Sequence, residues 1–170
     1  MVFHPRKKLF FKLFIFLVLL VALFGWMDSV QITGWHQVED INAFDHYADG
    51  PQQVYIGLWV IAFLAIGVMY YWFSGDWSEA LGASLAGLTM LAFGLLDVFF
   101  FILSPYSMTN SMCWFNTDGA LVGKFSELLG HSCTTIADLW IFGLLGLVLA
   151  YLIFKYFFYK TPIKRKNPLK

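Results

Sequence analysis

The stretch that settles the fold class is Val54–Phe73, VYIGLWVIAFLAIGVMYYWF, which contains no charged residue. About 20 mostly apolar residues in a helix are enough to cross the hydrocarbon core of a bilayer. Three further stretches, at approximately 9–27, 80–103 and 134–154, are comparably long and apolar. The sequence therefore predicts an all-α integral membrane protein, a bundle of four membrane-spanning helices.

The composition of the 170-residue chain agrees with this prediction, since 59% of its residues are hydrophobic and only 13% are charged. Soluble domains carry about 25% charged residues. A soluble chain of this size could not bury so much apolar surface, and a disordered chain has low hydrophobicity with high net charge. Both classes are excluded, and we expect one membrane domain over 1–170.

The charges are sorted along the chain in a way that predicts its orientation. Ten of the eleven basic residues lie near the two ends of the chain, and only Lys124 lies elsewhere. The predicted outer loop 28–53 contains acidic residues but no Lys or Arg. The positive-inside rule then places both termini in the cytoplasm and the loops 28–53 and 104–133 outside. We expect a multi-pass protein of the cell or plasma membrane.

The first predicted helix follows a basic segment, as a secretory signal does, but its apolar run is longer than the roughly 7–15 residues of a signal core. We expect it to be a retained anchor.

Two acidic residues lie inside the predicted helices, Asp97 in the third and Asp138 in the fourth. An ionisable side chain in a membrane helix costs roughly 2.5–3.5 kcal/mol, so its presence suggests a function. Counting from the predicted helix ends puts both carboxylates in the outer leaflet. Two neighbouring carboxylates in a low-dielectric site share one proton, as an aspartic peptidase requires. We expect Asp97 and Asp138 to be a catalytic dyad that cuts a membrane-anchored peptide near the outer leaflet.

Two alternatives remain open for these acids. In the first, each carboxylate is hydrogen-bonded by a helix neighbour such as Thr89 or Thr135, and the chain is a non-enzymatic subunit or partner of a larger membrane complex. In the second, the acids belong to a proton or cation relay. The observation that separates them is whether the carboxylates of Asp97 and Asp138 meet or have separate partners.

The third helix contains Gly94-Leu95-Leu96-Asp97, and the fourth opens with Thr135-Ile136-Ala137-Asp138. Together with Asp28 at the end of the first helix, these motifs and the four-helix layout resemble the lipoprotein signal peptidase (signal peptidase II) family. The resemblance implies a membrane aspartic peptidase in which Asp97 and Asp138 are catalytic. The sequence has Val98 where the family has an arginine. The stretch between the two aspartates is also longer than in the family, which makes Asp118 a rival partner for Asp138.

Other candidate sites lie in the predicted outer loops. Cys113 and Cys133 share one loop, so an oxidising exterior favours a disulfide between them, with two free thiols as the alternative. His36, His46 and His131 are suitable metal ligands by type, but their spacing matches no helical metal motif. We expect no bound metal and no cofactor. The expected partners are the lipid bilayer and either a peptide substrate or other membrane subunits, and we expect no nucleic acid.

Overall fold

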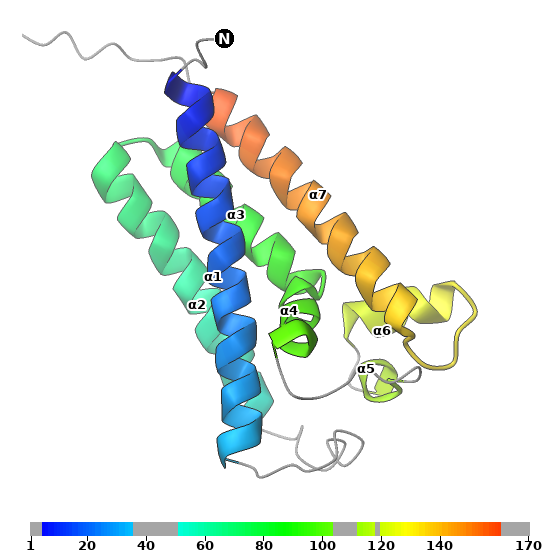
Figure 1. The fold of residues 1–170 in the computed structure, drawn as a ribbon. Coiled ribbons are helices and arrows are strands. Elements are labelled where there is room, and N and C mark those ends of the chain that lie inside the picture. Colours follow the sequence, from blue (N-terminus) through cyan, green and yellow to red (C-terminus); the bar gives the residue numbers. More distant parts are fainter. Residues whose placement is uncertain (1–4, 36–50, 104–111, 118–119, 161–170) are drawn as a thin grey trace, which may run out of the picture.

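The computed structural model describes residues 5–35, 51–103, 112–117 and 120–160. Within these ranges the chain forms seven helices and no strand, apart from an isolated β-bridge between Met112 and Thr134. The helices are α1 (Pro5–Trp35), α2 (Pro51–Ser74), α3 (Trp77–Ala92), α4 (Leu95–Leu103), α5 (Trp114–Thr117), α6 (Leu121–Leu128) and α7 (Ile136–Lys160), as Figure 1 shows.

Three segments are long and apolar enough to cross a membrane: Lys8–Val30, Gly57–Ser74 and Ile136–Lys160. The consecutive helices α3 and α4 make a fourth span if the bent pair is counted as one. All four apolar stretches are therefore helical, as the sequence predicts, and the fold is compatible with a multi-pass membrane protein. The start of α1 and the end of α7 lie at the same end of the molecule (Figure 1).

The third predicted helix, 80–103, is not continuous. It is broken between Ala92 and Leu95, where the helix axis bends by 63°. Gly94 provides the turn with a φ of 70°, a conformation that glycine adopts without a steric penalty. The arms also have different neighbours, because α3 packs mainly on α2 and α7 whereas α4 packs mainly on α1.

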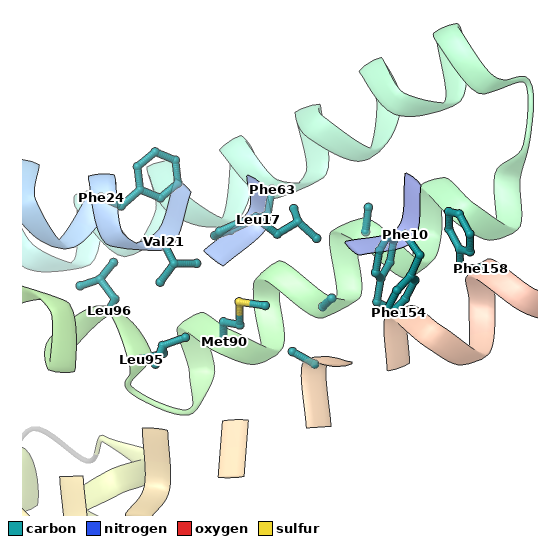
Figure 2. Packing of buried hydrophobic residues seen from close by; sticks show 13 residues of the cluster. Phe10, Leu17, Val21, Phe24, Phe63, Met90, Leu95, Leu96, Phe154 and Phe158 are labelled. Carbon is teal, nitrogen blue, oxygen red and sulfur yellow. The ribbon is translucent and has the colours of Figure 1, made fainter. Parts of the chain in front are cut away.

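The core between the long helices is built from aromatic and small side chains. Phe10 of α1 stacks on Phe154 of α7 with ring centroids 5.1 Å apart, and Phe158 lies beside them (Figure 2). Nearer the other end of α1, Phe24 packs edge-on against Phe63 of α2. Because α1 repeats its buried residues at helical spacing, its remaining apolar side chains form an exposed face that suits lipid.

One face of α3, which carries alanines, is buried. Ala83, Ala86 and Met90 are all at most 4% exposed. The opposing helix α7 also approaches closely, since a Cβ added to Gly143 would lie only 2.9 Å from Val98 Cγ2. Small residues allow membrane helices to pack at short distance, and this contact holds α4 against α7.

Candidate functional site

Asp138 is the third residue of α7, and its carboxylate caps the N-terminus of that helix. The backbone N–H of Thr135 donates to Asp138 Oδ2 at 2.9 Å, and the backbone N–H of Asp138 donates to Thr135 Oγ1 at 3.2 Å. This reciprocal arrangement is a capping box, in which each side chain satisfies a backbone N–H that the helix leaves free. The carboxylate also lies at the positive end of the helix dipole.

One more side chain contacts the same carboxylate. His131 Nδ1 lies 2.8 Å from Asp138 Oδ2. Asp138 is only 1% exposed, whereas the His131 side chain is 45% exposed. The histidine therefore covers the aspartate and forms the accessible edge of the pair.

A buried polar network continues from this pair into α5 and α6. Asn116 Oδ1 accepts from both the backbone N–H and the hydroxyl of Thr134, each at 3.0 Å. The hydroxyl of Ser126 lies 3.2 Å from Thr134 Oγ1 and 3.0 Å from the carbonyl oxygen of Val122. Among the described residues no buried side-chain nitrogen or oxygen lacks a partner. A network satisfied in this way fixes a unique local structure.

A disulfide between Cys113 and Cys133 closes this region covalently. The neighbouring residues Met112 and Thr134 form the β-bridge, with the Met112 N–H donating to the Thr134 carbonyl at 2.9 Å. The segment before α5 is thus joined to the segment before α7 by one covalent bond and several hydrogen bonds. We call α5, α6 and this linked segment, residues 112–117 and 120–135, the cap.

Asp97 occupies the matching position in α4, since it too is the third residue of its helix. A Cβ added to Gly94 would lie 3.3 Å from Asp97 Oδ2, so the carboxylate lies back over the break between α3 and α4. The backbone N–H of Val98 donates to the Gly94 carbonyl at 3.1 Å, which starts the helix. Asp97 is partly buried.

The acid that interacts electrostatically with Asp97 is Asp28 of α1. The two helices cross closely one turn before Asp28, where a Cβ added to Gly25 would lie 2.8 Å from the Leu96 carbonyl oxygen and 2.9 Å from the Phe100 nitrogen. This crossing brings Asp28 toward the start of α4. Among the described residues neither carboxylate forms an ion pair with Lys, Arg or His.

The structure therefore gives the two predicted catalytic acids different partners. Asp97 interacts with Asp28, while Asp138 contacts Thr135 and His131.

Several other predicted candidates fall outside the described residues. These are the rival acid Asp118 and the histidines His36 and His46. Within the part of the chain that the structure describes, no group of three or more His, Cys, Asp or Glu side chains is placed to hold a metal ion.

Sequence reasoning found the acids but missed the role of His131. The spacing Thr135-x-x-Asp138 is a signal for a helix start and points to the capping box. The contact between His131 and Asp138 joins positions seven apart, across the bend at 132–133 that leads into α7. No local sequence pattern predicts this contact, because it depends on how the chain turns before α7.

No family model, curated protein or solved structure matches this chain. The resemblance to lipoprotein signal peptidases stays a prediction. The function is therefore argued from the positions and contacts of the residues themselves.

Proposed function

We propose that this chain is a four-span membrane bundle with both termini in the cytoplasm, and that it acts as a non-enzymatic subunit or partner protein of a larger membrane complex. The observation that supports this proposal is the environment of Asp138. Its carboxylate is almost fully buried and already accepts hydrogen bonds at a helix start. An aspartic peptidase needs a carboxylate free to take a proton from water, so these contacts favour a structural role for Asp138.

The exposure of α2 supports the same proposal. Only 11% of its apolar span is buried inside the molecule, compared with 28% for α1 and 33% for α7. Near its end Trp72 and Phe73 are 84% and 85% exposed. In a complex this face is the one with the most room for a neighbouring helix.

Site-specific photocrosslinking in intact cells tests the proposal. A photoreactive amino acid is placed at Val68, which is 56% exposed, and a matched control at Phe63 on the same helix, which is fully buried. We expect the Val68 variant to crosslink to a discrete membrane protein in a fixed ratio, and the Phe63 variant to give no such product. A Val68 variant that crosslinks only to lipid, in a protein that migrates as a monomer in native membranes, would contradict the proposal.

A second candidate function is that of an aspartic peptidase, cutting a membrane-anchored peptide near the outer leaflet. The observation that favours it is the close crossing of α1 with α4 at Gly25, which brings Asp28 toward Asp97. Two carboxyl groups that interact in a low-dielectric site hold one proton between them. On this reading Asp28 and Asp97 are the reacting pair and Asp138 maintains the fold.

Three substitutions separate the candidates when the protein is reconstituted in liposomes with a lipid-anchored peptide. For the Asp28 pair, D28N and D97N abolish cleavage while D138N, at a temperature where it stays folded, retains it. Loss in D97N and D138N with an active D28N would identify the pair expected from the sequence. Absence of cleavage by the unmodified protein would count against a peptidase that accepts this peptide.

A further inference from the structure

The helix α6 and the residue that follows it carry three exposed leucines, although this segment lies outside the predicted spans. Leu121, Leu128 and Leu129, which directly follows the helix, are 54%, 83% and 49% exposed. At 3.6 residues per turn these leucines and Phe125 fall within an arc of about 100°. We call Leu121, Phe125, Leu128 and Leu129 the α6 stripe.

The other two sides of α6 have different roles. Val122, Gly123 and Ser126 are buried and face the protein. Lys124 and Glu127 are exposed and form an ion pair at 3.1 Å, outside the arc of the α6 stripe. The helix therefore has a protein side, a charged side and an apolar side, and the three leucines on the apolar side are exposed.

The contact of Phe125 shows which way the α6 stripe faces. Its ring stacks on Phe142 of α7 with centroids 5.1 Å apart. Phe142 lies six positions after Ile136, about 9 Å along the helix from the start of α7. The side of α6 that bears Phe125 is thus directed along α7 toward the middle of the span.

The depth of α6 relative to the membrane follows from the basic residues at the other end of α7. Lys155 is the first basic residue toward that end, and a span of about 20 residues counted back from it reaches Thr135. The cap then lies at the level of the lipid headgroups. Figure 1 shows α6 lying crosswise at the end of α7 and extending sideways beyond it.

We propose that α6 is an interfacial anchor that inserts the α6 stripe between lipid headgroups on the membrane face opposite the chain termini. A short helix with one apolar and one charged side is the arrangement that lies in the plane of a membrane surface. Because Lys124 and Glu127 neutralise each other, insertion does not require anionic lipid. The inference uses the four-span arrangement but not the subunit role.

The test is a paramagnetic relaxation measurement on the full chain in phosphatidylcholine nanodiscs. Leucine methyl groups are labelled, and L128M and L129M variants identify the two signals. We expect lipid carrying a nitroxide near the headgroup to broaden the Leu128 and Leu129 signals, and a water-soluble gadolinium chelate to leave them sharp. Leu144, which is 53% exposed on α7, is the control for a side chain in contact with lipid. Leu139, which is fully buried, is the control for a side chain that contacts neither lipid nor water.

Broadening of Leu128 and Leu129 by the gadolinium chelate would overturn the proposal, because the stripe would then face water. Protection of both signals from both agents would also overturn it, because protein would then cover the stripe. The response of Leu144 separates these failures from a failure of the membrane assignment, since Leu144 contacts lipid in any four-span arrangement.

Discussion

His131 and Asp138 make a contact in which one partner is half exposed and the other is almost fully buried. Removing the aspartate leaves the N–H of Thr135 without its capping carboxylate, whereas removing the histidine leaves the carboxylate without its outer neighbour. We expect unfolding free energy to fall in both D138N and H131A, and further in D138N. A double-mutant cycle should give a coupling of about 1 kcal/mol, since contacting residues do not act independently.

The measurement is reversible unfolding in mixed detergent micelles, followed by circular dichroism. The exposed pair of Lys124 and Glu127 is the matched control, and its coupling should stay below about 0.5 kcal/mol because exposed ion pairs contribute little. Equal couplings for the two pairs would show that burial of Asp138 adds nothing.

Gly94 is the residue on which the bend between α3 and α4 depends. Its φ of 70° is strained for any residue with a Cβ, so we expect G94A to lower the free energy of unfolding by about 1 kcal/mol or more. G57A is the control, because Gly57 is helical and a Cβ there meets nothing within 4 Å. We expect G57A to be neutral or stabilising in the same unfolding assay. A G94A variant with the unfolding free energy of the unmodified protein would show that the bend does not need glycine.

At this scale the sequence identifies which residues are unusual but not what they touch. Asp97 and Asp138 are conspicuous because acids are rare in apolar segments. Their partners depend on helix rotation and on the break at Gly94, and neither is encoded in spacing along one helix. Asp28 was visible as an acid at the end of a span, and only the crossing of α1 with α4 brings it toward Asp97.

Among the elements, the cap is the one held by a covalent bond. The disulfide joins residues 20 positions apart, and closing a loop of that size restricts the unfolded chain by about 3 kcal/mol. We expect the double variant C113S/C133S to lose stability of that order, measured by unfolding under non-reducing conditions. The unmodified protein under reducing conditions is the control and should match the double variant. A double variant as stable as the oxidised protein would mean that hydrogen bonds alone hold the cap.

The long elements were predictable and the short ones were not. A run of about 20 apolar residues has one stable solution in lipid, a helix, because every backbone polar group must be satisfied within the segment. A predicted loop at 104–133 gave no comparable signal for α6, since eight residues with apolar, charged and buried sides resemble an irregular surface segment. The break at Gly94 was hidden because glycine is common in unbroken membrane helices.

For the whole molecule, the number of crossings decides on which sides the termini lie. Four spans place both termini on one side, and the basic residues near both ends predict the cytoplasmic side. We expect protease added to sealed right-side-out vesicles to spare tags at both termini, and protease added to inverted vesicles to remove both. If α3 and α4 instead formed a re-entrant loop, the termini would lie on opposite sides and each preparation would lose one tag.

The bend between α3 and α4 also has a consequence for the order of biosynthesis. It is supported from both ends of the chain: Gly25 of α1 allows the close approach of α4, and Gly143 and Gly146 of α7 lie against Val98 and Phe93 at the break. During translation the apolar segment that becomes α3 and α4 leaves the ribosome before α7 exists. A nascent chain that stops before Ile136 lacks the contacts that α7 makes at the break, so we expect the final shape of this segment to be set after the last span has inserted.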